Sequence, residues 1–157
     1  GIDESNAQGV YVLYPKDPQK TAAEVWRHLR IKHACQKLGV LIADSQITPL
    51  RRGVVGAAIG WCGFKPLHSY AGQSDCFGRP LRYTAINLLD SLASAAVLLM
   101  GEGAEQTPLA IIKHAPHMVF QDRPPTLEEE HSAAISVEED LFAPFFTELP
   151  WHRSKSD

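Results

Sequence analysis

Four oxygen-bearing side chains of this sequence could take part in holding a divalent metal ion: Asp3, Asp44, Ser45 and Glu102. Each lies at the boundary of an expected element or in a loop, where a side chain can face a cleft. Carboxylate and hydroxyl oxygens suit Mg²⁺ and Mn²⁺ in sites that neutralise nucleotide phosphates. Acidic residues at such boundaries more often cap a helix, form a turn or face water. Taken alone, the four residues therefore indicate a metal site only weakly.

Arg51 is the candidate catalytic residue among the basic side chains. Arg51 and Arg52 are adjacent, so in an extended segment they point to opposite sides and at most one faces a cleft. A guanidinium fork suits a substrate carboxylate or phosphate. A solvated surface pair is the competing interpretation, and it is weaker for Arg51, which follows Pro49 and Leu50.

The cysteines and histidines indicate little chemistry. Cys35, Cys62 and Cys76 are three, so they cannot all pair within one chain, and a reduced, cytoplasmic protein is expected. Cys62 has no His or Asp nearby in sequence to activate it, and buried packing is the better interpretation. His114 and His117 could bind zinc only if their loop brought them together, which we regard as the less favoured alternative.

The first elements along the chain are expected to bring Asp44 and Ser45 to a site. Residues 10–14 are typical of a strand, and an amphipathic helix closed by a glycine is expected over 18–39. Residues 40–43 form an apolar run too short for a helix, which predicts a buried strand. Asp44 and Ser45 would end that strand and face a cleft.

The later elements complete an α+β fold. Residues 53–64 combine glycines with β-branched and aromatic residues, which favours a bulged strand over small-residue helix packing. Strands are also expected at 81–84 and 108–112, and the clearest helix covers 88–100, ended by Gly101. Strands and helices alternate without a regular βαβ rhythm, so we expect a mixed or antiparallel sheet with two main helices.

Composition divides the chain near residue 120. Residues 1–120 carry the expected elements, whereas 121–157 form a C-terminal extension rich in proline, acidic residues and phenylalanine. Phenylalanines in such a segment more often form a docking surface than a ligand site. The first residue is glycine rather than methionine, which predicts a processed or truncated chain.

Charge and hydropathy exclude two classes of partner. The 157 residues include 15 basic and 18 acidic side chains, for a formal charge of -3, so no broad basic field for nucleic acid is expected. The longest apolar run is short and helical in pattern, and no basic segment leads into an apolar stretch at the N-terminus. Neither nucleic acid nor a membrane is an expected partner.

Five segments, in order and with compatible spacing, resemble the coenzyme F-420:L-glutamate ligase family. They are 1–6, the expected strand with Asp44 and Ser45, 49–63, 75–79 and 92–102. The resemblance covers roughly residues 1–113 and implies that 1–120 is the C-terminal portion of a γ-glutamyl ligase domain. Members of this family are similar in forming intertwined homodimers with a sheet-rich, irregular fold. A homodimer is also expected because five aromatic side chains exceed what so small a lobe easily buries: Trp61, Phe64, Phe142, Phe145 and Phe146.

The resemblance implies a GTP-dependent ligase with two divalent ions, Mg²⁺ or Mn²⁺. Asp3 and Asp44 would hold one ion, Ser45 and Glu102 the other, and Asn6 would contact the nucleotide. A loop would wrap the nucleotide with Met100, Gly101, Glu102, Gly103, Ala104, Glu105, Gln106 and Thr107. The reaction of the family phosphorylates a carboxylate to an acyl phosphate, which the amino group of glutamate then attacks. The implied partners are the nucleotide, glutamate, the carboxylate acceptor, a second copy of the chain and a missing N-terminal segment.

The sequence departs from the family pattern in two places. Ser45 stands where the family usually has threonine, which keeps a hydroxyl for metal binding. Residues 46–52 lack the usual Phe-Gly-Arg stretch, and this departure concerns the acceptor. The sequence resembles a divergent branch labelled as folate-metabolism γ-glutamate ligases, so coenzyme F-420-0 and folate-type acceptors both remain open. A truncated, non-catalytic homologue that dimerises or binds a ligand is the alternative function. Without the phosphate-binding segment of the family, this chain alone is expected to be inactive.

Overall fold

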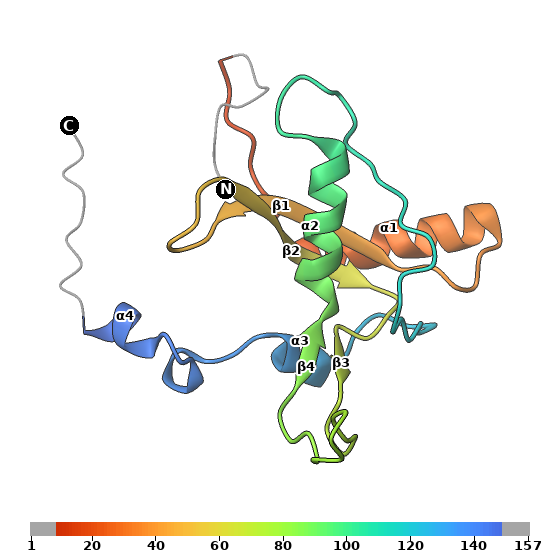
Figure 1. The fold of residues 1–157 in the computed structure, drawn as a ribbon. Helices are drawn as coiled ribbons and strands as arrows, with labels where there is room; N and C mark the ends of the chain where they lie inside the picture. Colours follow the sequence, from red (N-terminus) through yellow and green to blue (C-terminus); the bar gives the residue numbers. More distant parts are fainter. Residues whose placement is uncertain (1–8, 149–157) are drawn as a thin grey trace.

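The computed structural model describes residues 9–148, which form four α-helices, a 3₁₀ helix and two small antiparallel sheets within that range (Figure 1). The elements are α1 (Pro18–His33), β1 (Val40–Ile47), β2 (Val54–Cys62), β3 (Leu67–Ser69), β4 (Ala85–Asn87), α2 (Leu88–Met100), α3 (Leu127–Ala133), the 3₁₀ helix η1 (Val137–Glu139) and α4 (Ala143–Thr147). The predicted α+β class with two main helices is confirmed. Over 9–148, no helix is long and apolar enough to cross a membrane.

The β1–β2 hairpin is the central element, and it contains a β-bulge. Ile42 pairs with Gly60 and Ala43 pairs with Ala58, so Ile59 is left without a partner in the register. An extra residue on one strand bends it and resets the alternation of its side chains. The residues of β2 on the two sides of the bulge therefore alternate out of phase: Gly56 lies against Ala93 of α2, whereas Gly60 lies against Pro18 of α1. The glycine-rich strand predicted for 53–64 is confirmed as β2.

Helix α1 packs on one face of the hairpin. Ala22 and Trp26 of α1 form a buried cluster with Cys62 of β2. The side chain of Gln19 pairs with the backbone of Trp61 in both directions, at 2.6 Å from Nε2 to the carbonyl oxygen and 3.2 Å from the amide nitrogen to Oε1. These two hydrogen bonds attach the first turn of α1 to β2.

The end of α1 differs from the prediction. Ala34, in the left-handed conformation with φ 49°, caps the helix at His33, whereas the sequence favoured Gly39 as the cap. Gly39 instead allows close contact with the ring of Phe64. Trp26 Nε1 donates to the carbonyl of Leu38 at 2.9 Å. The chain therefore leaves the helix five residues early because tertiary packing, rather than the glycine, decides where it turns.

Helix α2 packs on the opposite face and is attached to β2 by two side chains. Asp90 Oδ1 accepts a hydrogen bond from the amide of Ala58 at 2.9 Å, next to the bulge, and Ser94 Oγ donates to the carbonyl of Gly56 at 2.9 Å. Asn87 caps the helix by accepting from the amide of Asp90. A second buried cluster on this side contains Trp61, Phe64 and Leu89.

Three predicted strands do not form where the sequence placed them. Residues 10–14 contain only an isolated bridge at Val12, and 108–112 have no regular structure. The strand that pairs with β3 is 85–87 rather than 81–84. The strand predicted to end at Ala43 continues to Ile47. Side-chain propensity favours a strand only where a neighbouring strand is available to accept its hydrogen bonds.

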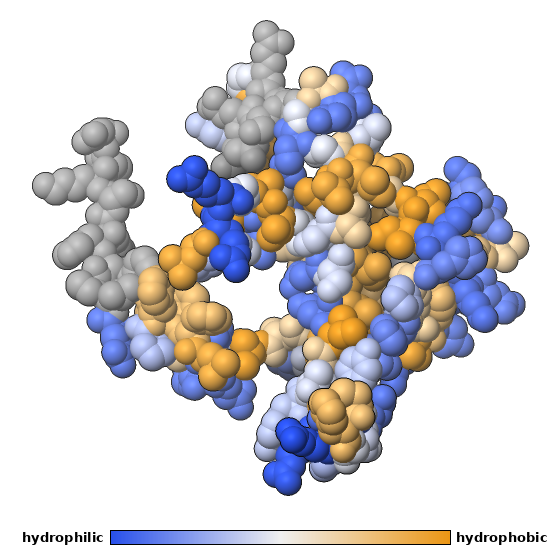
Figure 2. Space-filling model, in the orientation of Figure 1, coloured by the Kyte–Doolittle hydropathy of each residue, from blue (hydrophilic) through white to orange (hydrophobic). Residues whose placement is uncertain are grey.

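Residues 120–133, around the start of the predicted C-terminal extension, are attached to the body. Phe120 forms a bridge with Phe64, the amide of Gln121 donates to the carbonyl of Gly63 at 2.8 Å, and Ala133 of α3 packs against the second cluster. Further on, α4 lies apart from the hairpin (Figure 1). Figure 2 shows apolar side chains over α4, where Phe142, Phe145 and Phe146 are 69%, 59% and 54% exposed.

We expect Gly63→Ala to lower the free energy of unfolding by about 3 kcal/mol or more, because a methyl group there collides with two neighbours and the backbone is left-handed. A Cβ at Gly63 would overlap Trp26 Nε1 and the carbonyl of Leu38, and φ is +87°. Gly53→Ala is the matched control, since φ is +88° but nothing lies within 4 Å; its cost should be about 1 kcal/mol. Equal losses for the two variants in urea denaturation would contradict this account.

Candidate functional site

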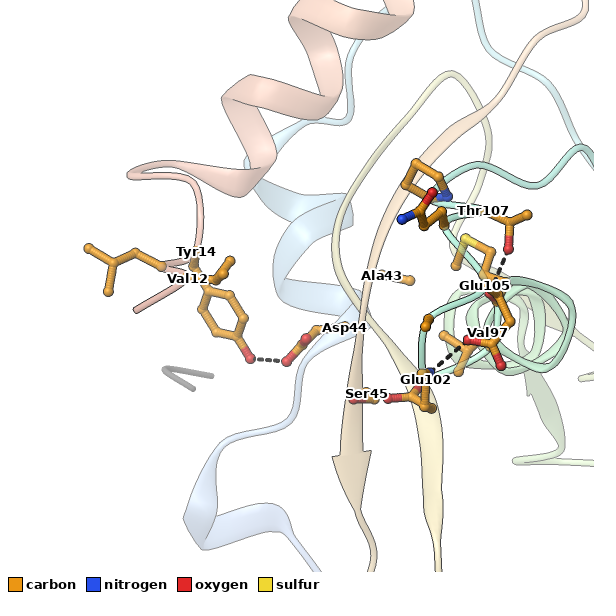
Figure 3. A pocket seen from close by; sticks show the side chains of 16 residues that line it. Val12, Tyr14, Ala43, Asp44, Ser45, Val97, Glu102, Glu105 and Thr107 are labelled. Atoms are coloured by element: carbon orange, nitrogen blue, oxygen red, sulfur yellow. Dashed lines mark hydrogen bonds between the residues drawn. The ribbon is translucent and has the colours of Figure 1, made fainter. Parts of the chain in front are cut away.

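A cavity of about 670 Å³ lies at the outer edge of β1. Its wall comes from the segment before α1, from the middle of β1, and from the end of α2 with the following loop (Figure 3). The lining residues are Val12, Leu13, Tyr14, Ala43, Asp44, Ser45, Val97, Met100, Gly101, Glu102, Gly103, Ala104, Glu105, Gln106, Thr107 and Pro108. The structure therefore brings together Asp44, Ser45 and the entire loop 100–107, which the sequence analysis had singled out separately.

Asp44 and Ser45 approach the cavity from opposite faces of the hairpin. Asp44 pairs with Ala57 and Ser45 with Gly56. Directly opposed residues on two strands project on the same face, and neighbours along one strand project on opposite faces. Gly56 lies against Ala93 of α2, so Ser45 is on the α2 face and Asp44 on the α1 face. Within the described chain β1 pairs with β2 alone, so at its outer edge both side chains reach one cavity.

The Asp44 carboxylate is bound by Tyr14. The Tyr14 hydroxyl donates to Asp44 Oδ2 at 2.5 Å (Figure 3). Partial burial raises the pKa of Asp44, because it disfavours the charged form. Interactions of the carboxylate, among them the hydrogen bonds from Tyr14 and from the backbone of Ser45, lower the pKa by more than burial raises it. The pKa of Asp44 therefore lies below its ordinary value. The same hydrogen bond, followed by burial, raises the pKa of Tyr14. Asp44 therefore stays an anion, as a ligand for a divalent cation must be.

The loop that follows α2 is folded back on itself. Glu105 Oε2 accepts from the amide of Gly103 at 2.7 Å, and Thr107 Oγ1 donates to the carbonyl of Met100 at 2.6 Å. Gly101 has φ +79°, and its α-carbon lies so close to the Glu105 carboxylate that a Cβ would overlap it. These contacts turn the chain sharply at the end of α2, and they place Glu102 on the cavity wall with Ser45.

The other predicted site residues are not part of this wall. Asp3 and Asn6 lie outside the described residues. Arg51 is exposed in the turn between β1 and β2, where its guanidinium donates to the carbonyl of Leu50 at 3.4 Å, and it does not line the cavity. Its role toward a substrate stays a prediction.

Sequence reasoning missed the contact between Tyr14 and Asp44. Tyr14 was assigned to a strand, and its distance of 30 residues from Asp44 gave no sign of the hydrogen bond. Only the docking of α1 on β2 brings the two together.

The carboxylates of Asp44 and Glu102 and the hydroxyl of Ser45 are the kinds of oxygen ligand that Mg²⁺ and Mn²⁺ take. Over residues 9–148, no three His, Cys, Asp or Glu side chains converge as a metal site. Asp44 on one face of β1, and Ser45 with Glu102 on the other, could hold such a cation only together with further oxygen ligands. His117, which the sequence analysis considered with His114 for zinc, stacks its ring on that of His68, with the two ring centroids 4.2 Å apart.

Cys62 is a packing residue, as the sequence indicated. Its side chain is fully buried against Ala22 and Trp26. Burial raises the pKa of the Cys62 thiol to about 11, so almost no thiolate nucleophile is present near neutral pH.

The fold and the cavity define an α+β protein with an oxygen-lined site beside a glycine-containing loop. The family model described as F-420-0:gamma-glutamyl ligase matches residues 1–114. Coenzyme F-420:L-glutamate ligases are similar: that of Methanopyrus kandleri is 46% identical over 114 residues, covering 72% of this chain and 45% of the relative. The ligase of Methanothermobacter thermautotrophicus is 39% identical over 117 residues, covering 74% of this chain and 46% of the relative.

The chain belongs to the F-420-0:gamma-glutamyl ligase family. It spans about half the length of the curated relatives that it matches. The family resemblance seen in the sequence is thereby confirmed.

We expect Gly101→Ala to destabilise the loop 100–107, because alanine at φ +79° is strained and its methyl group would displace the Glu105 carboxylate. The combined cost of strain and of the lost Glu105–Gly103 hydrogen bond should be about 2 kcal/mol. Gly103→Ala is the control, since its nearest contact would be 3.3 Å from Glu105 Oε2. Thermal melts and limited proteolysis of the loop compare the two. A control variant as damaged as Gly101→Ala would contradict the assigned role of Gly101.

Proposed function

We propose that this chain supplies metal- and nucleotide-binding residues of a ligase that joins L-glutamate to a carboxylate acceptor, using GTP and two Mg²⁺ or Mn²⁺ ions. The acceptor is coenzyme F-420-0 or a related carboxylate, folate-type molecules included. The observation that carries this proposal is the convergence of Asp44, Ser45 and Glu102 with the loop 100–107 in one cavity. Membership of the F-420-0:gamma-glutamyl ligase family supports the reaction class.

The two faces of β1 suit two separate cations. Asp44, with Asp3, would hold one ion on the α1 face, and Ser45 with Glu102 would hold the other on the α2 face. The ions supply charge neutralisation of the triphosphate when bound. The loop 100–107 is hydrogen-bonded within itself, so contact with a nucleotide would cost it little conformational entropy.

The reaction requires the protein mainly to align its substrates. An oxygen of the acceptor carboxylate attacks the γ-phosphorus of GTP, GDP leaves, and an acyl phosphate results. The amino group of glutamate then attacks the acyl carbon, losing a proton as inorganic phosphate departs and the amide forms. Both displacements depend on in-line alignment and on stabilisation of phosphate charge rather than on covalent work by the protein.

The cavity requires further parts to complete it. Asp3, Asn6, Arg51 and the other half of the ligase domain are the proposed contributors, and the reduced cysteines suit a cytoplasmic enzyme.

A homodimer is part of the proposal. Trp61 and Phe64, which the sequence counted toward a dimer, do not support it, because they are buried within one chain at 7% and 2% exposure. The exposed phenylalanines of α4 continue to support it.

We expect the full-length protein to be a dimer at micromolar concentration, because the apolar side chains that α2 and α4 expose would be covered by a second copy. Leu98 and Leu99 of α2 are 83% and 71% exposed. Size-exclusion chromatography with light scattering measures the mass. A monomer that binds no apolar dye would speak against the dimer.

We expect Asp44→Asn in the full-length protein to weaken Mn²⁺ binding by at least about tenfold and to lower catalysis in parallel. The change keeps the shape of the side chain but removes the charge that a hard cation needs. Loss of a residue that only orients a metal ligand already lowers metal affinity by about 10- to 100-fold, so loss of a ligand's charge should lower it at least as much. Without metal, the melting temperature should stay the same or fall slightly, because asparagine keeps an acceptor for the Tyr14 hydroxyl but loses the charge that the surroundings of Asp44 stabilise. Calorimetric Mn²⁺ titration and melts in chelator measure both quantities.

Asp90→Asn is the matched control. Asp90 Oδ1 accepts from the amide of Ala58 at 2.9 Å and Oδ2 from Asn87 at 2.7 Å, so the amide should cost about 1–3 kcal/mol of stability. Mn²⁺ affinity should not change, because Asp90 does not line the cavity. Unchanged Mn²⁺ binding in Asp44→Asn, together with a lower melting temperature, would defeat the assignment of Asp44 as a ligand.

A further inference from the structure

Tyr14 contacts the cavity through its hydroxyl group. That hydroxyl donates to Asp44 Oδ2 at 2.5 Å, while the residue as a whole is 46% exposed. In Figure 3 the phenol reaches Asp44 from the side opposite to Ser45 and Glu102. The ring thus contributes little to the core, and its specific contact is the one with the carboxylate.

The position of Tyr14 is set by rigid elements. It lies three residues before Asp17, whose side chain caps α1 by accepting from the amide of Lys20 at 2.9 Å. A Cβ on Gly60 of β2 would lie only 2.5 Å from the carbonyl oxygen of Pro18, so the start of α1 is in direct contact with the hairpin. The phenol and the carboxylate are therefore presented by two elements that are packed on each other.

We propose that Tyr14 is a positioning residue that fixes the Asp44 side chain in the orientation required for binding a divalent cation. A carboxylate on a strand edge has freedom about two torsions, and a hydrogen bond to one oxygen removes much of it. A hydrogen bond to Oδ2 also sets which lone pairs of the carboxylate face the cavity. Partners of this kind orient metal ligands in many sites, and their loss costs about 10- to 100-fold in affinity.

This inference rests on the proposed function, because it assumes that Asp44 binds a metal ion. One competing role has the opposite sign: if the Tyr14 hydroxyl occupied the oxygen that the cation needs, removing it would strengthen metal binding. A second competing role is structural, in which the hydrogen bond merely attaches the segment before α1 to β1. That role predicts lost stability without metal and no separate effect on affinity.

The test is Tyr14→Phe in the full-length protein, with Mn²⁺ alone as the probe and no nucleotide. We expect the dissociation constant for Mn²⁺ to rise by about tenfold in calorimetric titration. The melting temperature in chelator should fall only slightly, because phenylalanine keeps the ring and loses one partly exposed hydrogen bond. Tyr11→Phe is the matched control, because Tyr11 lies in the same segment, is 62% exposed and does not line the cavity; it should alter neither quantity.

Asp44→Asn, measured beside it, separates the two proposals. If Asp44→Asn weakens Mn²⁺ binding and Tyr14→Phe leaves it unchanged or strengthens it, the role of Tyr14 is overturned and the metal site stands. If Asp44→Asn leaves Mn²⁺ binding unchanged, the metal site itself fails and the inference about Tyr14 fails with it. A lower melting temperature for Tyr14→Phe with unaltered Mn²⁺ affinity would assign Tyr14 the structural role instead.

Discussion

The close approach of both main helices to β2 is the constraint on which the rest of the structure depends. Gly60 allows the backbone of Pro18 to lie against β2 on one face, and Gly56 allows that of Ala93 to do so on the other. A side chain at either position would overlap helix backbone, which cannot move aside as a flexible side chain can. The segment before α1 and the end of α2 line the same cavity at β1. The segment before α1 and the loop after α2 therefore meet at Asp44 and Ser45.

The β-bulge at Ile59 decides which residues of β2 face α1 and which face α2. On the core side of the bulge, Trp61 faces α2 and Cys62 faces α1. Because the side-chain period of a strand is two, one extra residue reverses the faces of every residue beyond it. Asp90 stabilises this register by accepting from the amide of Ala58 beside the bulge. The faces of Asp44 and Ser45 follow instead from the unbroken alternation of β1, in which Val40 and Ile42 pack with the α1 cluster and Leu41 with the α2 cluster.

The described chain also leaves much apolar surface exposed. Leu109 and Ile111, in the segment predicted as a strand, are 87% and 83% exposed. Side chains of this type are stabilised by burial at roughly 25 cal/mol per Å², and their segment has no neighbouring strand within residues 9–148. This exposure accords with the proposal that the other half of the domain and a second copy complete the fold.

Local patterns in the sequence were sufficient for the elements whose signals are short-range. The run 88–100 ended by Gly101, the start of α1 after Asp17 and the glycine-rich strand β2 all follow from spacing, caps and composition. The sequence also determined the family and the chemical types of the candidate ligands. These features depend on residues within a few positions of one another, so a linear sequence displays them directly.

Only the tertiary structure decided the rest. Two features depend on partners 12 or more residues away along the chain: the early end of α1 at His33 and the contact of Tyr14 with Asp44. Two others depend on partner strands: the bulge at Ile59 and the absence of a strand over 108–112. Strand propensity describes a side chain, whereas a strand also requires a neighbour for its backbone groups. A contact across 30 residues, such as that of Tyr14 with Asp44, leaves no local pattern, because it arises only when helices pack on a hairpin.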